Sequence, residues 1–163
     1  LQHDRQFQKI SAYIIKKVAD SLNDIFKNDR KKYENIWEDI SYFVKYGILT
    51  DEKFSEAVKD ILIFKSSNDD FVTIKEYLER NKSEAKPQKI YYAAGEDTQV
   101  SFLNLMKAQG IEVIFTNPII DSHIFQHLEM KNSDVTFVRI DSEINENLVD
   151  KDKHEIADAS NQI

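Results

Sequence analysis

Residues 89–140 decide the fold, and they read KIYYAAGEDTQVSFLNLMKAQGIEVIFTNPIIDSHIFQHLEMKNSDVTFVRI. Three short apolar runs, at 89–94, 111–115 and 135–140, are rich in β-branched and aromatic residues and predict strands. Helical patterns of apolar residues fill the two intervals between them. This alternation predicts a mixed α/β fold in which a small three-stranded parallel sheet is covered by helices, an αβα layer.

The part of the chain before this layer predicts three amphipathic helices. Apolar residues recur every three or four positions over 7–25, 33–44 and 54–62, which places them on one face of each helix. Gly47 is expected to end the second helix as a left-handed cap, and the third is expected to begin after residue 50 or 51. Because each helix has a single apolar face, the three should pack against one another.

A connecting region joins the helices to the sheet. Residues 66–70 (SSNDD) are expected to form a loop, and Thr73 and Glu76 have the reciprocal spacing of a capping box for a short helix over 74–80. The polar stretch at 81–88 contains a proline and is expected to be a boundary. The chain thus divides into a helical segment at 1–64, a loop, short helix and linker at 65–88, a small αβα subdomain at 89–140 and an acidic tail at 141–163.

Charge and composition exclude several classes of protein. The 163 residues carry a formal net charge of −7, which disfavours binding to nucleic-acid phosphates. Residues 141–163 contain seven acidic residues and two lysines, so this tail contributes −5 and is expected to be an extended terminus or linker. The absence of cysteine excludes disulfides and thiolate metal sites, and no apolar run is long enough to span a bilayer. We therefore expect a cytoplasmic protein without a membrane or nucleic-acid partner.

No complete catalytic or metal-binding motif occurs in the sequence. His123 and His127 lie four apart on a predicted helix, but Ile124 stands where a zinc protease has Glu and no third ligand follows, so a metal site is not expected. Gly95 follows a strand where α/β sheets bind phosphate, yet the Glu96 and Asp97 carboxylates next to it would repel an anion. These two acids are expected to cap the following helix.

Aromatic residues cluster in the second predicted helix. Trp37 and Phe43 continue the apolar stripe of this helix and are expected to belong to the core. Tyr42 and Tyr46 are four positions apart on the flank of the stripe, so they are expected to be exposed and available to a partner.

Several strings of the sequence, taken in order, carry a family resemblance. They are KISAYIIKKVADSL (9–22), YENIWEDISYFVKYGILTDEKFSEAVKDILIFKSS (33–67), FVTIKEYLERNK (71–82), QKIYYAAGE (88–96), and GIEVIF (110–115) followed by PIIDSHIFQHL (118–128). In this order and spacing they resemble the middle domain of the ninety-kilodalton heat-shock chaperone family, in its bacterial HtpG form. The likeness runs from Leu1 to about Leu148, and a start at Leu1 rather than Met agrees with a fragment of a longer chain.

This resemblance implies a role that the chain fulfils only as part of a larger chaperone. The parent would be a homodimeric, ATP-dependent stress chaperone with an N-terminal nucleotide-binding domain, a middle domain and a C-terminal dimerisation domain. ATP and magnesium would be cofactors of the parent, and the fragment alone is expected to be no enzyme. Leu1 and Gln2 match the end of the family motif Ser-Arg-Glu-x-Leu-Gln, which makes Gln2 an ATPase-assisting residue by resemblance and places the arginine before Leu1.

The resemblance also implies that the chain helps to hold non-native client proteins and docks onto the other domains. The candidates for client contact are His123, Ile124, Phe125 and His127, although Ile124 and Phe125 have packing under the sheet as an equal alternative. The sequence departs from the family here, because many members have an acid and an aromatic residue where this chain has Ser122 and His123.

Two other functions stay open on the sequence alone. A stand-alone small α/β ligand-binding domain or enzyme would use the loops after Gly95 and Phe115, at the carboxyl ends of the strands. A helical adaptor would use Tyr42 and Tyr46, and it requires both rings to be exposed.

Overall fold

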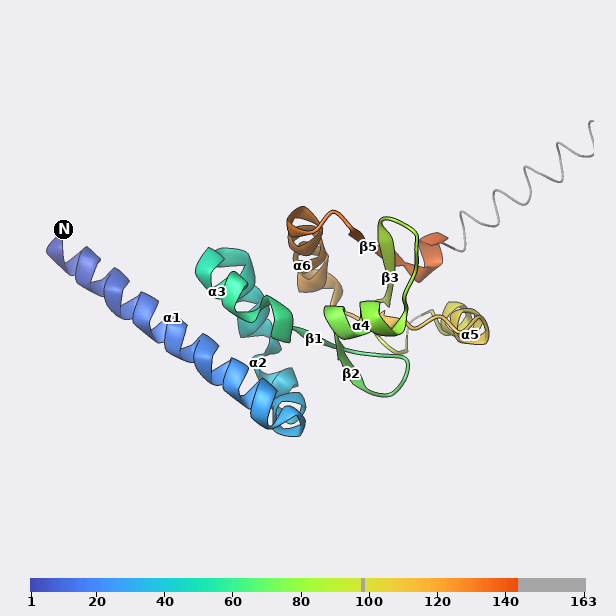
Figure 1. Ribbon diagram of the computed structural model, residues 1–163, viewed down its shortest axis with the longest axis horizontal. Helices are drawn as coiled ribbons and strands as arrows, with labels where there is room; N and C mark the ends of the chain where they lie inside the picture. The colour runs from blue at the N-terminus through green and yellow to red at the C-terminus, as the bar shows by residue number, and fades with distance from the viewer. Residues whose placement is uncertain (98, 144–163) are drawn as a thin grey trace, which may run out of the picture.

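The computed structural model describes residues 1–97 and 99–143, and Figure 1 shows a group of helices on one side and a small sheet with further helices on the other. The first group consists of α1 (Gln2–Asn28), α2 (Arg30–Thr50) and α3 (Glu52–Val58), followed by a short 3-10 turn, η1 (Lys59–Ile61). Asp29 caps α2 and Asp51 caps α3, each by accepting a hydrogen bond from the backbone N–H group three residues further on. The predicted three-helix segment is confirmed.

Gly47 does not end α2, which corrects the predicted left-handed cap. The helix continues for one turn to Thr50. A Cβ atom at Gly47 would lie 2.6 Å from Cε1 of Phe54, so a side chain at this position would collide with the buried ring from α3. The glycine therefore allows α3 to pack closely against α2, and it does not change the direction of the backbone.

A two-stranded antiparallel hairpin follows the helices, and the sequence patterns do not reveal it. It consists of β1 (Ile63–Lys65) and β2 (Phe71–Thr73), which the loop at 66–70 connects. Each strand has only three residues, and β1 continues the apolar run of the preceding helix. Ser66 forms an isolated bridge to Ile114, so the hairpin also contacts the second part of the molecule.

Helix α4 (Ile74–Arg80) begins as predicted, but its cap is only half of a capping box. The Thr73 hydroxyl accepts a hydrogen bond from the Glu76 N–H at 3.1 Å. The Glu76 carboxylate does not reach back to Thr73. Instead it accepts two hydrogen bonds from the Arg30 guanidinium, at 2.8 and 3.2 Å, which joins α4 to the start of α2.

The second part of the molecule is a parallel sheet with the strand order β4-β3-β5. Its elements are β3 (Gln88–Ala93), α5 (Val100–Ala108), β4 (Ile114–Phe115), α6 (Pro118–Lys131) and β5 (Val135–Arg139). The mixed α/β fold class with a small αβα layer is confirmed. Strand β4 is shorter than predicted because the N–H and C=O of Val113 pair with Ser67 in the hairpin loop rather than with β3.

The main core runs through both parts. Tyr33 and Trp37 are buried in the helical segment, and Phe64 of the hairpin packs near Phe125 of α6. Phe43, predicted to be in the core, is 76% exposed. The buried side of α2 includes Val44 and Ile48, and a step of one residue turns a helical side chain by about 100°, which carries Phe43 out of the core. Residues 144–163, which make up most of the predicted acidic tail, lie outside the described residues.

Candidate functional site

Helix α6 carries the four residues that the resemblance nominates for client contact. Asn117 caps the helix and Pro118 occupies its first turn. Ile124 and Phe125 are 0% and 4% exposed, and the ring of Phe125 stacks on Phe137 of β5 with 3.9 Å between centroids. The alternative for these two residues, packing against the sheet, is thus the arrangement observed, and neither side chain is available to a partner on the surface.

The two histidines of α6 differ in their surroundings. His123 is exposed to solvent, and His127 is partly buried, with its Nε2 atom 2.9 Å from the Ser55 hydroxyl of α3. Among the described residues, no group of three or more His, Cys, Asp or Glu side chains is arranged to hold a metal ion. Of the four candidates, His123 alone is exposed, while His127 contributes to the joint between α6 and α3.

A buried ion pair fixes α6 against α2. The Lys45 ammonium lies 2.7 Å from Oδ1 of Asp121, and their side chains are 8% and 1% exposed. Lys45 also lies 5.3 Å from the centre of the Phe64 ring, within range of a cation–π contact. The other carboxylate oxygen of Asp121 accepts a hydrogen bond from the Asn117 N–H. The pair therefore determines where the surface of α6, including His123, stands relative to the helical segment.

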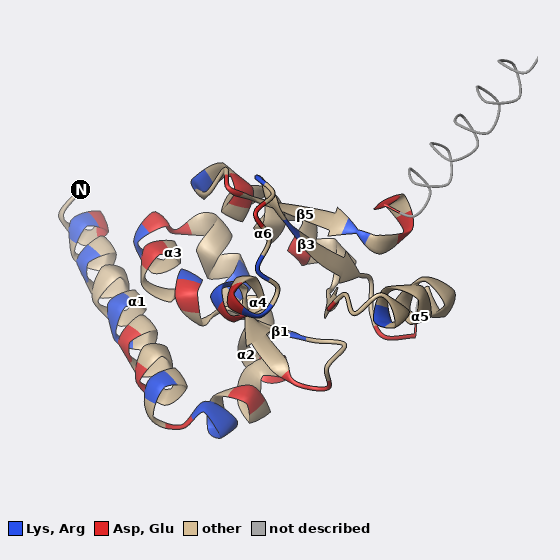
Figure 2. Cartoon of the chain, turned by 45° about the vertical axis from the view of Figure 1, so that its right-hand side comes forward, with Lys and Arg blue, Asp and Glu red and all other residues tan. Residues whose placement is uncertain are grey.

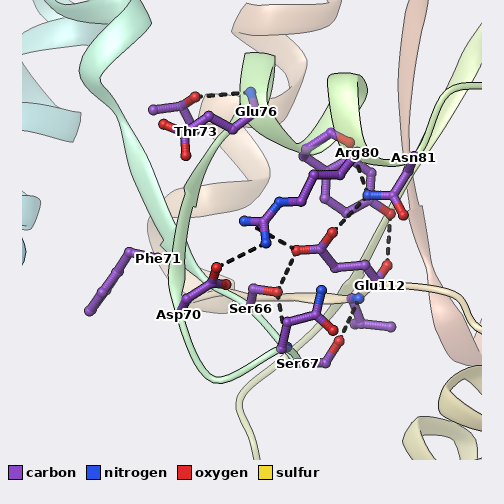
Figure 3. Close-up of polar contacts among 12 residues, drawn as sticks. Ser66, Ser67, Asp70, Phe71, Thr73, Glu76, Arg80, Asn81 and Glu112 are labelled. Atoms are coloured by element: carbon purple, nitrogen blue, oxygen red, sulfur yellow. Dashed lines mark hydrogen bonds and ion pairs between the residues drawn. The ribbon is translucent and has the colours of Figure 1, made fainter.

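A polar network around Glu112 joins the hairpin, α4 and the segment before β4 (Figure 3). Glu112 is 4% exposed, and its carboxylate accepts hydrogen bonds from the Ser66 hydroxyl at 2.6 Å and from the Asn81 amide at 2.7 Å. Arg80 lies 3.7 Å from the same carboxylate and 2.9 Å from Asp70. A cavity of about 420 Å³ opens next to this network.

The chemistry of the Glu112 network is structural. Each carboxylate oxygen of Glu112 accepts a hydrogen bond, and the Tyr77 hydroxyl donates to the Glu112 backbone carbonyl at 2.7 Å. The cavity lining includes Lys107 and Ser67, and the Ser67 hydroxyl accepts a hydrogen bond from the Val113 N–H at 2.9 Å. The sequence analysis did not single out Glu112, although a lone acid inside the apolar run GIEVIF was a signal that a buried polar partner was required.

The turn after β3 does not form the predicted helix cap. Glu96 pairs with Lys65 of the hairpin, and α5 begins only at Val100, with Gln99 as its N-cap residue and no side-chain capping bond. Glu96 and Asp97 are thus not used to cap α5, which corrects that prediction. The Glu96 carboxylate beside Gly95 also makes this turn unsuitable for phosphate.

The part of α1 that precedes Ala19 presents apolar side chains to solvent. The exposed fractions of its large apolar residues are 71% for Phe7, 60% for Ile10, 62% for Tyr13, 54% for Ile14 and 46% for Val18. Gln2, carried over by resemblance as an ATPase-assisting residue, is exposed at the start of the same helix. Figure 1 shows that the first turns of α1 extend beyond the other helices. This exposed stripe of Phe7, Ile10, Tyr13, Ile14 and Val18 is called the α1 apolar face below, and contiguous exposed apolar side chains mark interaction surfaces.

Helix α2 adds exposed aromatic rings. Tyr42 and Tyr46 are 55% and 60% exposed, as predicted, and Phe43 joins them. Among the described helices, none combines the length and the hydropathy that a bilayer-spanning helix requires.

Comparisons with known proteins agree on one family. The family model described as Hsp90 protein matches residues 1–162. The chaperone protein HtpG of Bacteroides fragilis strain YCH46 is 34% identical over 168 residues, which cover 99% of this chain and 25% of the relative. HtpG of Porphyromonas gingivalis strain ATCC 33277 is 38% identical over 157 residues, covering 94% of this chain and 23% of the relative. The chain thus spans about a quarter of the length of these curated relatives.

A solved structure supports the fold. The middle domain of a putative heat shock protein from Plasmodium falciparum superposes with a TM-score of 0.66 at 20% sequence identity, covering 84% of this chain and 59% of that one. At this identity the likeness concerns the fold alone. The relatives are chaperone proteins, so the interpretation as a stand-alone α/β ligand-binding domain or enzyme is not favoured.

Proposed function

The chain belongs to the Hsp90 protein family, and from this premise we propose that it acts as a middle-domain fragment of an HtpG-like, ATP-dependent chaperone. In this role it contributes to the binding of non-native client proteins and docks onto the N-terminal and C-terminal domains of the same protein. The proposed parent is a cytoplasmic stress-response protein that assembles as a homodimer through a domain outside this chain. The divisions at residues 64, 88 and 140 are part of the same proposal.

The observation that carries this proposal is the α1 apolar face. Its five large apolar side chains lie on one side of α1, and four of them are more than half exposed. Covering this apolar surface would be favourable by roughly 25 cal/mol for each square ångström. A helix face of this kind suits a chain that normally packs against further parts of a larger protein.

We further propose that ATP and magnesium are cofactors of the parent protein and are not bound by this fragment alone. The turn after β3 carries Glu96 next to its glycine, and the described residues include no group of three metal-ligating side chains. We therefore assign nucleotide hydrolysis to the parent protein and no catalytic step to this fragment. Gln2 assists hydrolysis in the parent only when the preceding arginine and the nucleotide-binding domain are present.

Client contact involves the surface of α6 rather than its buried side. His123 is exposed and belongs to this surface, whereas Ile124 and Phe125 stabilise the core beneath it. His127 positions α6 through its contact with Ser55. This division reduces the four candidate residues to one direct contact and three residues that support it.

A binding experiment tests the proposed function. A reduced and carboxymethylated protein, which stays unfolded, is titrated with the chain, and the same protein in its native state serves as the control. We expect saturable binding of the unfolded form at least about tenfold tighter than of the native form, and no saturable ATP hydrolysis by the chain. Equal affinity for both forms, or measurable ATP turnover, would contradict the proposal.

A further inference from the structure

One face of α2 presents three aromatic rings to solvent. Tyr42, Phe43 and Tyr46 are 55%, 76% and 60% exposed. Tyr46 lies four positions after Tyr42 and three after Phe43, so it neighbours both rings on the helix surface. Within residues 1–97 and 99–143, none of these rings stacks on another ring or lies over a cation. Adjacent exposed aromatic side chains of this kind mark interaction sites.

Two carboxylates accompany the rings. Glu38 and Asp39 are exposed and lie four positions before Tyr42 and Phe43, directly next to them on the helix surface. Neither carboxylate forms an ion pair or a side-chain hydrogen bond with the described residues. Lys65 is close enough to Glu38 to interact electrostatically, but Glu96 already holds it in an ion pair. This part of α2 therefore combines aromatic surface with uncompensated negative charge.

We propose that the α2 aromatic face, formed by Glu38, Asp39, Tyr42, Phe43 and Tyr46, binds segments of non-native proteins in which arginine or lysine stands next to apolar residues. This inference rests on the proposed function and names the class of client segment. Aromatic rings attract cations through their π faces, with arginine the most common partner. The neighbouring carboxylates add direct charge complementarity.

The same chemistry disfavours other occupants. An acidic segment would meet two free carboxylates, and nucleic-acid phosphate would be repelled for the same reason. A second copy of the chain would bring a second set of Glu38 and Asp39 against the first. A basic and apolar segment uses both features of the face, because aromatic side chains contribute large contact areas at interfaces and tyrosine is frequent at their energetic centres.

Three labelled peptides test the inference by fluorescence anisotropy. The first contains Arg and Leu separated by Gly and Ser, the second has Glu in place of each Arg, and the third has Ser in place of each Leu. We expect the first peptide to bind at least about tenfold more tightly than the other two at low salt, and its affinity to fall as the salt concentration rises. Equal binding of the first and second peptides would overturn the proposal.

Two sets of variants locate the site. The triple variant Tyr42→Ser, Phe43→Ser and Tyr46→Ser should weaken binding of the first peptide at least about tenfold, and Glu38→Gln with Asp39→Asn should weaken it several-fold and reduce its salt dependence. The matched control replaces two exposed apolar residues of α5, Val100→Ser and Leu105→Ser, which are 54% and 43% exposed. The control should bind the first peptide with an affinity within about twofold of that of the unsubstituted chain. Thermal unfolding verifies that all variants are folded.

The outcomes separate this inference from the proposed function. If the unsubstituted chain binds the unfolded protein and the α2 variants bind it equally well, the α2 aromatic face is not the site and the proposed function stands. If the first peptide binds through α2 but the unfolded protein does not bind, the proposed function fails. Equal losses in the α2 and α5 variants would overturn the assignment of the face.

Discussion

Two buried tyrosines have hydroxyl groups that matter for the stability of the fold. The Tyr33 hydroxyl donates a hydrogen bond to the Ile61 carbonyl at 2.5 Å, and the Tyr77 hydroxyl donates to the Glu112 carbonyl at 2.7 Å. Burial raises the pKa of both hydroxyls well above the ordinary value for tyrosine. Both side chains therefore stay neutral in the folded chain under conditions where a solvated tyrosine ionises.

This difference predicts a loss of stability in alkaline solution. Above about pH 10 the unfolded chain releases these two protons while the folded chain keeps them, so the free energy of unfolding falls as the pH rises. Each tyrosine contributes a slope of about 1.4 kcal/mol per pH unit in that range. Urea unfolding between pH 9 and about pH 11 measures how the free energy of unfolding changes with pH.

Variants assign the alkaline slope to these residues. Tyr77→Phe should lower the stability at neutral pH by about 1 to 3 kcal/mol, because the hydroxyl that donates to the Glu112 carbonyl and accepts from the Tyr91 N–H is lost, and should make the alkaline slope shallower. The matched control is Tyr13→Phe, which removes a hydroxyl from a ring that is 62% exposed and should leave the slope unchanged. An identical slope in all three chains would show that the buried hydroxyls are not responsible.

Local signals in the sequence are reliable where one residue acts on its own neighbours. Asp51 and Thr73 cap the helices that follow them, as their positions predict. Gly47 and Glu76 are interpreted wrongly from sequence because their partners are distant in the chain: Phe54 of α3 occupies the space beside the glycine, and Arg30 of α2 binds the glutamate. Spacing along one helix contains no information about such partners.

At the scale of elements, the joint between α2 and α6 connects the helical segment to the sheet. Lys45 is the only described partner of Asp121 Oδ1, and both side chains are almost fully buried. Separating such a pair leaves a buried charge without compensation, which is more costly than the net contribution of the intact pair. This joint is therefore expected to be sensitive to single substitutions.

Lys45→Met should lower the free energy of unfolding by about 3 to 5 kcal/mol, because the Asp121 carboxylate would remain buried and unpaired. Adding Asp121→Asn to the same chain should recover part of this loss. The control is Lys131→Met, which breaks the exposed pair with Glu52 and should cost at most about 1 kcal/mol. Chemical denaturation provides the comparison, and equal losses for the two lysine variants would contradict the argument.

The elements themselves were largely predictable, and the hairpin was not. Helix periods and the strand–helix alternation are repeated many times in the sequence, so α1, α4 and the three parallel strands follow from it. Strands β1 and β2 have three residues each, which is too short for a period to be recognised. The hairpin depends on contacts that are remote in sequence, such as Ser66 with Glu112 and Ser67 with Val113.

At the scale of the whole molecule, α1 is divided between two environments. Its second half holds the buried residues Ala19 and Leu22, whereas residues 1–10 are all exposed. Figure 2 shows charged segments interspersed with uncharged ones along the helix, so its outer half is not simply a charged, solvated rod. The outer half of α1, whose apolar residues point away from the core, contributes little to the stability of this chain and is suited to packing against further parts of a parent protein.

This division predicts opposite results in two contexts. In the isolated chain, replacing Phe7 and Ile14 by Ser should change the free energy of unfolding by less than about 1 kcal/mol, because both side chains are more than half exposed. Leu22 is only 9% exposed, so Leu22→Ala should lower the free energy of unfolding by about 2 to 5 kcal/mol. In the parent chaperone the same two serine substitutions should increase hydrogen exchange along α1 and lower ATP turnover. Without these apolar side chains, the α1 apolar face would no longer dock against the surface that covers it. Small effects in both contexts would show that the α1 apolar face is no docking surface, and a large loss in the isolated chain would show that it belongs to the core of this fragment.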